Sequence, residues 1–267
     1  LLGIDPTPLG AAPFTLTIGA PVDLRATDLD LDLPFARAHI GPCIAGHVGA
    51  DAAAALLNER THDTVEPQLM VDVGTNAEIV LGTAGRSYAA SSPTGPAFEG
   101  AQISSGMRAT AGAIERIRID RETFEPRFKV IGADAWSDEP EFAEQTAKLD
   151  IAALCGSAII EVIGELYLAG VCDHKGVIQD LTAKTDRVVP DERTFTYVIR
   201  SEVTDDDGTT HPQLAITQND VRQIQLASSA LRAGIDLLME HAGITECHDV
   251  RLAGAFGAHI DPVYALV

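Results

Sequence analysis

The sequence predicts an α/β fold, in which strands and helices follow one another along one chain. Two observations lead to this prediction. Of the 267 residues, 46% are apolar and 5% are aromatic, a composition that suits a soluble α/β protein. Short apolar runs of strand character also alternate with stretches whose apolar residues recur at helical spacing. A chain of this length can bury a core and hold one large or two small domains.

The N-terminal quarter is predicted to contain one strand and one helix. Residues 1–36 are rich in Pro, Leu and Asp, and the prolines interrupt any long element. Residues 37–44 resemble a strand. Residues 47–57 are predicted to be helical, because good helix formers, mainly alanine, follow Gly46 and Gly49. The polar stretch 61–67 predicts a lobe boundary near residues 58–66.

The middle of the chain is predicted to be rich in strands. Residues 68–82 form an expected hairpin, residues 87–91 a third strand, and residues 114–119 and 127–131 alternate like a strand pair. Residues 154–169 have helical spacing, with Ser157 as a natural N-cap and Gly170 as a natural stop. The polar residues 180–212 are expected to form loops and edge strands.

The clearest helix is predicted over residues 219–241. Thr217 and Asp220 form a capping-box-like start, one apolar stripe follows, and Gly243 ends the helix. Residues 249–252 are expected to be a short strand that leads into the small residues 253–257. A further helix is predicted to begin near Asp261, which precedes a proline.

The hairpin at residues 68–82 contains the most informative motif. Asp72 stands where the first strand ends, and Gly74, Thr75 and Asn76 form the turn. Successive amides in such a turn can hold phosphate oxygens. A carboxylate beside them can position a hydrated Mg²⁺ ion, which favours oxygen ligands and keeps several waters. Taken alone, the motif also fits an ordinary hairpin with an Asx-type turn.

Two further segments could serve the same chemistry. The turn at residues 252–257 contains glycines that admit close approach of a nucleotide base and ribose, although a simple strand-to-helix turn is the alternative. Glu99, in the turn at residues 95–100, could orient water or Mg²⁺ near a phosphate. The alternative for Glu99 is a solvated loop carboxylate.

Composition excludes several classes of function. With 39 acidic and 19 basic residues, the net charge is −20, which disfavours nucleic acid and anionic membranes as partners. The four cysteines are scattered without a C-x-x-C pair, which argues against a zinc site or an iron–sulfur cluster in this chain. No apolar run approaches a membrane span, and a reducing cytoplasm is the expected location.

The order of these segments resembles the second half of the actin-like ATPase fold. The strings at residues 44–51, 71–82, 95–108, 155–157 and 252–257 are similar to one family within it, the reductive activators of corrinoid proteins. They read IAGHVGAD, VDVGTNAEIVLG, GPAFEGAQISSGMR, CGS and LAGAFG. The likeness covers almost the whole chain, as the C-terminal ATPase region of that family. Ala77 and Ala158 depart from it, since the family often has glycine there.

The resemblance implies an actin-like (RNase H-like) lobe with a mixed sheet flanked by helices and a partial second lobe at the N-terminus. Residues 1–58 would be the tail of the first ATPase lobe plus a crossing helix, and residues 59–267 the second lobe. The chain begins at Leu1 without a methionine and ends at Val267 within an apolar pattern. We therefore expect a piece of a longer protein, and we expect this piece alone to be inactive.

The resemblance also implies ATP and Mg²⁺ as ligands and electron transfer as the activity. A [2Fe–2S] ferredoxin domain, expected upstream of residue 1, would pass an electron to an inactive cobalt(II) corrinoid when ATP drives a conformational change. The partner would be a corrinoid protein or a corrinoid-dependent methyltransferase. A homodimer is left open. The alternatives are a small-molecule kinase of the same superfamily and a docking module without catalysis.

The resemblance assigns roles to particular residues. Asp72 is expected to hold Mg²⁺ or its waters and Glu99 to orient water, both as candidate catalytic residues. The amides of the phosphate turn and the bend at residues 254–257 are expected to bind the nucleotide. For this, Asp72 and the bend must converge on opposite walls of one cleft. The expected nucleotide-binding residues are Gly74, Thr75, Asn76, Gly95, Gly254, Ala255, Phe256 and Gly257.

Overall fold

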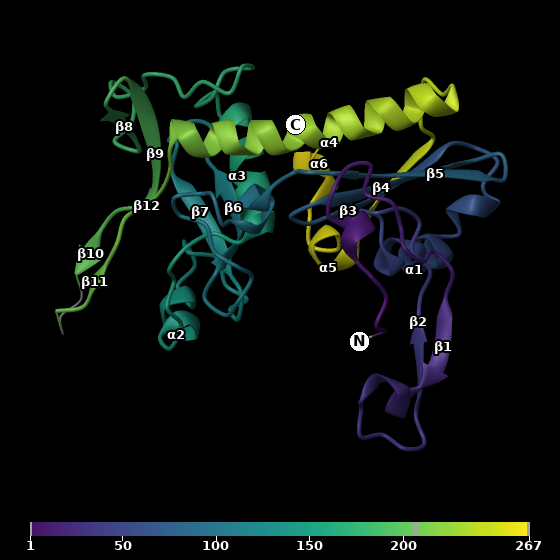
Figure 1. The fold of residues 1–267 in the computed structure, drawn as a ribbon. Coiled ribbons are helices and arrows are strands. Elements are labelled where there is room, and N and C mark those ends of the chain that lie inside the picture. Colours follow the sequence, from purple (N-terminus) through teal and green to yellow (C-terminus); the bar gives the residue numbers. More distant parts are fainter. Residues whose placement is uncertain (1, 205–207, 266–267) are drawn as a thin grey trace. The chain divides into compact units, whose positions relative to one another are not determined.

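The structure, a computed structural model, describes residues 2–204 and 208–265 (Figure 1). Both ends of the sequence, from which we predicted a longer protein, lie outside the described residues, as do residues 205–207. The chain divides into two compact units. The first comprises Leu1–Val73, Ala77–Ser92 and Arg232–Gly257, and the second comprises Gly74–Asn76, Pro93–Leu231 and Ala258–Val267.

The first unit is built around a four-stranded mixed sheet of order β13-β3-β4-β5 (Figure 1). Strand β13 (Asp249–Ala253) runs parallel to β3 (Gln68–Val73), while β4 (Ala77–Thr83) and β5 (Arg86–Ser92) continue the sheet in antiparallel pairs. Strands β3 and β4 are buried along nearly their whole length, which matches their continuous apolar sequences. The predicted hairpin and third strand are confirmed.

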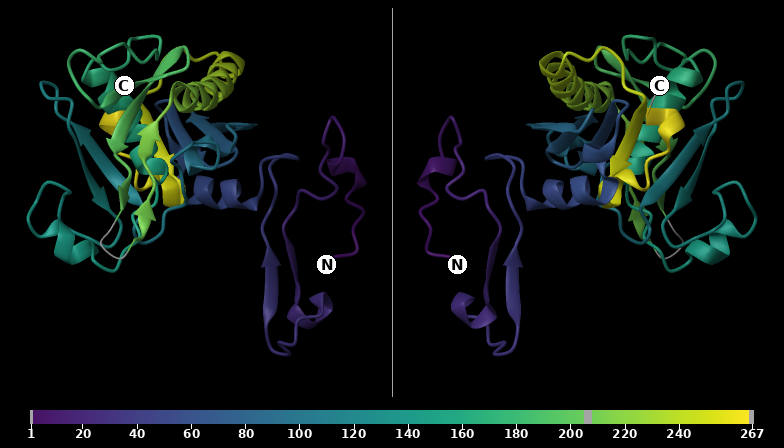
Figure 2. Two further views of the ribbon diagram at one scale, coloured as in Figure 1. Left: turned by 90° about the vertical axis from the view of Figure 1, so that its left-hand side faces the viewer. Right: turned by 90° about the vertical axis from the view of Figure 1, so that its right-hand side faces the viewer.

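The N-terminal part of this unit contains a small hairpin. Strands β1 (Val22–Arg25) and β2 (Arg37–Ile40) pair in antiparallel fashion (Figure 2). The strand predicted over residues 37–44 stops at Ile40, because Pro42 cannot donate to a ladder and a tight turn follows it. Helix α1 (Ala50–Glu59) begins later than predicted, after Gly49. Three short 3₁₀ helices complete the segment: η1 (Thr7–Leu9), η2 (Ala26–Leu29) and η3 (Thr61–Asp63).

The second unit contains smaller sheets and helix α3 (Gly156–Leu168), which packs on β6 (Ile114–Ile119). Strand β6 pairs with β7 (Pro126–Val130), as predicted. A 3₁₀ helix, η4 (Pro96–Glu99), and helix α2 (Phe142–Thr146) also belong to this unit. The prediction of Ser157 as the N-cap of α3 was wrong, because Cys155 holds that position. The Ser157 hydroxyl instead donates to the Glu115 carbonyl at 3.0 Å.

The prediction of loops and edge strands over residues 180–212 was wrong for one strand. Strand β9 (Thr194–Arg200) lies between β8 (Val188–Asp191) and β12 (Leu214–Ile216) in a three-stranded sheet. Its β-branched and aromatic residues favour a strand, and Tyr197 is fully buried with its hydroxyl donated to the Phe124 carbonyl. The short strands β10 (Val203–Thr204) and β11 (Thr210–His211), which follow β9 in the sequence, pair with each other in antiparallel fashion.

Helix α4 (Gln218–Ala242) is shared by the two units, with Arg232 the first of its residues in the first unit. The predicted capping box is confirmed: Thr217 donates its amide to the Asp220 carboxylate at 2.8 Å, and Asp220 returns its amide to the Thr217 hydroxyl at 3.1 Å. Gly243 follows with φ +70°, a conformation typical of a helix end. The last elements are α5 (Gly254–Gly257) and α6 (Pro262–Ala265).

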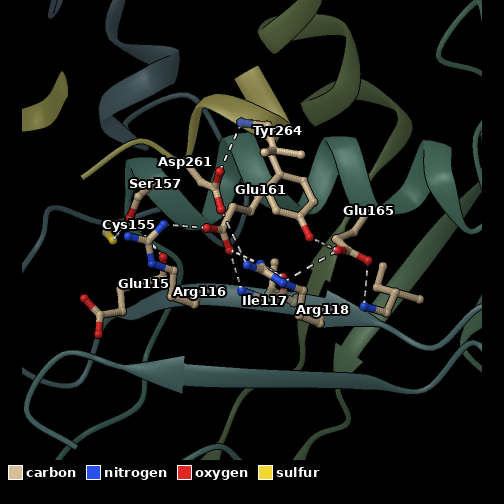
Figure 3. A network of polar contacts seen from close by, with 12 residues as sticks. Glu115, Arg116, Ile117, Arg118, Cys155, Ser157, Glu161, Glu165, Asp261 and Tyr264 are labelled. Atoms are coloured by element: carbon tan, nitrogen blue, oxygen red, sulfur yellow. Dashed lines mark hydrogen bonds and ion pairs between the residues drawn. The ribbon is translucent and has the colours of Figure 1, made fainter. Parts of the chain in front are cut away.

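A buried ion network joins α3 to β6 in the second unit (Figure 3). The Glu161 carboxylate is fully buried and accepts hydrogen bonds of 2.6 Å from Arg116 and Arg118, and one of 3.0 Å from the Ile117 amide. Burial alone would lower the pKa of Arg116, but the bond and charge of Glu161 outweigh it and raise that pKa. These three hydrogen bonds offset the free-energy cost of removing the Glu161 carboxylate from water.

The same network holds the turn α6. The Tyr264 hydroxyl donates to the Glu165 carboxylate, and the Arg118 guanidinium lies 4.5 Å from the centre of the Tyr264 ring (Figure 3). Burial, together with the bond to Glu165, raises the pKa of Tyr264 to about 12. Gly164 leaves room for this ring, because a Cβ there would meet it at 2.9 Å.

We expect Glu161→Gln to lower the free energy of unfolding by about 3 kcal/mol, because one amide cannot replace a buried charge shared by two guanidinium groups. Denaturant unfolding followed by the fluorescence of Trp136, which lies 5.8 Å from the Arg118 guanidinium, measures this. Glu122→Gln, on the exposed surface, is the matched control and should change little. A loss below about 1 kcal/mol would show that the network is dispensable.

Candidate functional site

Asp72 and Gly254 meet at one edge of the sheet in the first unit. Strands β3 and β13 are parallel, and Asp72 is the register partner of Ala253. The carboxyl ends of both strands therefore lie at the same edge. Gly254 has φ +78°, and a Cβ built on it would overlap the Asp72 carboxylate. The two segments converge as predicted, but they lie side by side rather than on opposite walls.

The bend after β13 is a single helical turn, in agreement with the strand-to-helix turn that was the alternative for residues 252–257. Helix α5 follows β13 directly. Gly254 and Ala255 are exposed, Phe256 is half-buried, and Gly257 is buried. A Cβ on Gly257 would lie 3.0 Å from the backbone of Leu252, so this glycine lets the turn fold back on its own strand. The exposed glycine beside Asp72 leaves its backbone open to a ligand.

Two other carboxylates, those of Glu78 and Asp51, interact with the Asp72 carboxylate. Glu78 on β4 is the cross-strand partner of Asp72, and Asp51 is in the first turn of α1. Burial raises the pKa of the Asp72 carboxyl, and the charge of Asp51 raises it further. Burial also raises the pKa of Glu78, against a hydrogen bond from Ser91, and the charges of Asp51 and Asp72 add to this. The site holds more negative charge than its surroundings neutralise.

This excess charge fits a divalent cation held chiefly by Asp72. In the described part of the first unit, no residue donates a hydrogen bond to the Asp72 carboxylate, which leaves its oxygens available. Nowhere in residues 2–204 and 208–265 are three His, Cys, Asp or Glu side chains arranged to ligate one metal ion. Mg²⁺ does not require such a cage, since it is often bound by one or two carboxylates and keeps several waters.

The turn after Asp72 belongs to the second unit. The Gly74 amide donates to the Asn76 carbonyl at 3.0 Å, so it is occupied within the turn and is not free for a phosphate, contrary to the prediction. In the described residues of that unit, nothing accepts a hydrogen bond from the amides of Thr75 and Asn76. These two amides remain available for an anion.

Residues after β5 form hydrogen bonds with this turn. The Gly95 amide donates to the Thr75 carbonyl at 2.9 Å, and Gly95 adopts φ +73°. The buried Thr94 hydroxyl donates to the carbonyls of Gly74 at 2.8 Å and Thr75 at 3.1 Å. The Thr75 hydroxyl donates to the Glu99 carboxylate at 2.9 Å. Glu99 therefore lies at the turn of residues 74–76 rather than in a free loop.

Three residues were not predicted from the sequence: Asp51 and Glu78, whose carboxylates interact with that of Asp72, and Thr94, which bonds to the turn of residues 74–76. Glu78 could have been found, because Asp72 and Glu78 are placed symmetrically about a three-residue turn and so become cross-strand partners. Asp51 begins a helix that is distant in sequence, so only the fold reveals its charge. Thr94 directly precedes the predicted Gly95, but a single threonine in a loop has no distinctive pattern.

No helix in the described part of the chain is both long enough and apolar enough to cross a membrane.

Comparison with known families defines the class of this protein. A family model described as the C-terminal domain of RACo, the ASKHA domain, matches residues 66–267. A second, described as the RACo middle region, matches residues 1–64. The chain thus carries an ASKHA domain, the domain of actin-like ATPases. It belongs to the RACo family, the reductive activators of corrinoid proteins, which confirms the resemblance.

Relatives with curated names agree. The chain is 34% identical over 268 residues to the corrinoid activation enzyme RamQ of Eubacterium limosum, covering 97% of this chain and 42% of that protein. It is 28% identical over 231 residues to the [Co(II) methylated amine-specific corrinoid protein] reductase of Methanosarcina barkeri, covering 83% and 38%. The chain spans about two fifths of the length of these relatives.

A solved structure has the same fold. It is a reductive activator for a corrinoid, iron-sulfur protein, which the chain matches with a TM-score of 0.78 at 26% sequence identity. The match covers 99% of this chain and 40% of that one.

We expect Asp72→Asn to raise the melting temperature at neutral pH by up to a few degrees when no Mg²⁺ is present. The folded-state pKa of Asp72 lies above its unfolded value, so the folded state favours the protonated carboxyl. The ionised carboxylate therefore destabilises the protein at neutral pH, and asparagine removes this effect. The gain should disappear below the ordinary pKa of an aspartate, as thermal scans from pH 3 to 7 would show.

The matched control is Asp32→Asn, an exposed carboxyl, which should leave the melting temperature unchanged. A lower melting temperature in Asp72→Asn at pH 7 would contradict the electrostatic description of this site.

We expect Gly254→Ala to weaken Mg²⁺–ATP binding by the full-length protein at least about tenfold, because the new methyl group displaces the Asp72 carboxylate. Gly243→Ala is the control. Gly243 has φ +70° against +78° for Gly254, but nothing lies within 4 Å of its added Cβ. Both variants incur a similar backbone strain of about 1–2 kcal/mol. If calorimetry gave the same Mg²⁺–ATP affinity for Gly254→Ala and Gly243→Ala, Gly254 would not be part of the binding site.

Proposed function

We propose that this chain is the ATP-binding region of an iron–sulfur protein that uses ATP to drive the reductive reactivation of a cobalt corrinoid protein. The meeting of Asp72 and Gly254 at the carboxyl ends of β3 and β13 is the observation on which the proposal rests. Membership of the RACo family and the names of the relatives support it. The assignment covers the whole protein, of which these residues form the nucleotide-handling part.

Each group of residues has a proposed role. Asp72 holds Mg²⁺ or its waters, and bound Mg²⁺ would neutralise charge on the phosphate oxygens. The amides of Thr75 and Asn76 receive the β- and γ-phosphates, with Gly74 and Gly95 shaping the turn. Residues 254–257 pack against the adenosine. Glu99 orients the water that attacks the γ-phosphate, which would give ADP and inorganic phosphate.

The redox step would use an electron from outside these residues. A [2Fe–2S] ferredoxin domain, when reduced, would supply the one electron that converts the cobalt(II) corrinoid to cobalt(I), and it would itself become oxidised. Hydrolysis of ATP supplies free energy for the conformational change. The corrinoid protein, or a corrinoid-dependent methyltransferase, is the partner that accepts the electron.

We also propose a domain division at residues 58 and 59, close to the point where the two family matches meet. Residues 1–58 would contribute the tail of a first ATPase lobe and its crossing helix, and residues 59–267 the second lobe. A cytoplasmic location is supported by the four cysteines, all of which are free. A homodimer is one assembly compatible with these assignments.

The test uses the full-length protein with its cluster reduced, a corrinoid protein in the cobalt(II) state, and Mg²⁺–ATP. Absorbance of the corrinoid should show conversion to cobalt(I), and phosphate should be released with it. Asp72→Ala should lower both rates by at least about a hundredfold while the cluster and the fold remain intact. Turnover like that of the unaltered protein in Asp72→Ala would refute the role of this carboxylate.

The same assay separates two other functions. A small-molecule kinase would transfer the γ-phosphate to an acceptor, so free phosphate would not appear with cobalt(I). A docking module would retain the partner without binding nucleotide, and calorimetry with Mg²⁺–ATP would then give no heat.

A further inference from the structure

A loop in the second unit connects the phosphate turn to the start of α4. This segment, the 100–107 loop, begins one residue after Glu99, whose carboxylate accepts the hydroxyl of Thr75. Near its middle, Ser104 donates its amide to Asp220 at 2.8 Å and its hydroxyl to the same carboxylate at 2.5 Å. The residues between Glu99 and Ser104 therefore link the turn of residues 74–76, through Thr75, to the first turn of α4, through Asp220.

The 100–107 loop is closed at its base by two glycines. Gly100 has φ +85°, and a Cβ there would lie 2.7 Å from the Met107 amide nitrogen. A Cβ on Gly106 would overlap the backbone of Gly100. The amide of Met107 donates to the Leu154 carbonyl, and the amide of Leu154 donates to the Ser105 carbonyl, both at 2.8 Å. The close contact of Gly100 with Gly106 and Met107 limits internal bending of the loop, and the two bonds to Leu154 attach its C-terminal end to the segment before α3.

Asp220 does more than cap its helix. A capping box requires only the reciprocal bonds between Asp220 and Thr217, which are present. Ser104 adds two further donors to the same carboxylate, which is 2% exposed. If the loop moved away, a buried carboxylate would lose half of its four hydrogen bonds. The position of the loop and the start of α4 are therefore energetically coupled.

Helix α4 extends from this start in the second unit into the first unit. It continues without a break to Ala242, and its residues from Arg232 belong to the first unit. There, a Cβ on Gly234 would lie 2.7 Å from the side chain of Ile79 on β4. Such tight packing allows little independent movement of the helix on the strand. Strand β4 pairs with β3, which carries Asp72.

We propose that Asp220 is a positioning residue of the nucleotide site. By holding Ser104, it fixes the 100–107 loop, and with it Glu99 and the phosphate turn, to α4. A γ-phosphate bound at the turn would favour the position in which Thr75 contacts Glu99 and Ser104 contacts Asp220. The presence of ATP rather than ADP would therefore reach α4 through the Asp220 carboxylate. The inference rests on the proposed nucleotide-binding function and adds to it the route by which the γ-phosphate is sensed.

Two variants of the full-length protein separate positioning from stability. Ser104→Ala and Thr217→Ala each remove one hydroxyl that donates to the same oxygen of Asp220, one from the loop and one from the helix start. Calorimetry gives the dissociation constants of Mg²⁺–ADP and of Mg²⁺ with the non-hydrolysable analogue adenylyl imidodiphosphate. Their ratio measures how strongly the γ-phosphate is recognised, and a purely structural defect would not change it.

We expect the unaltered protein to prefer the triphosphate analogue. Ser104→Ala should reduce that preference at least about fivefold, with the affinity for ADP unchanged. Thr217→Ala should lower the melting temperature and keep the preference. The analogue should also slow amide hydrogen exchange in the first turn of α4 in the unaltered protein, but not in Ser104→Ala.

Three results would overturn the inference: an unaltered preference in Ser104→Ala, an equal loss in Thr217→Ala, or no preference in the unaltered protein. If the unaltered protein bound neither nucleotide, the proposed function itself would fail, and this inference with it.

Discussion

The parallel pairing of β3 with β13 is the constraint on which the site depends. It joins segments 181 residues apart, from Gln68 beside Asp249 to Asp72 beside Ala253. Because both strands run the same way, the last residue of one and the bend after the other must lie at a common edge. Glycine is favoured at position 254, because its φ is +78° and any Cβ there would displace the Asp72 carboxylate. The strand register thus fixes both the location of the carboxylate and the identity of its neighbour.

The carboxylates around this edge indicate that the site is arranged for ligand binding at some expense to stability. Asp72 and Glu78 are like charges on directly opposed strand positions, which destabilises a sheet. Burial and the charge of Asp51 raise the pKa of Asp72 further. In contrast, Glu161 in the second unit is more deeply buried but has two arginines and an amide as partners. The candidate site therefore differs from the Glu161 network in that its negative charge is not compensated by basic partners.

Much of the fold and part of the site could be predicted from the sequence. The hairpin around Asp72 and the helix behind Thr217 and Asp220 have local signals, an apolar run interrupted at a tight turn and a capping box. The central position of strand β9, where loops and edge strands were predicted, was missed because charged neighbours mask its pattern. The engagement of the Gly74 amide and the charge of Asp51 could not be read from the sequence, since both depend on backbone geometry or on contacts between distant segments.

A crystal structure of the full-length protein with Mg²⁺ and a non-hydrolysable ATP analogue would test the assignment most directly. We expect the metal ion to lie within reach of the Asp72 carboxylate, directly or through a water, and the adenosine to lie against residues 254–257. The amides of Thr75 and Asn76 should contact the phosphates. A nucleotide bound away from the ends of β3 and β13, with Asp72 free of metal, would contradict the proposed site.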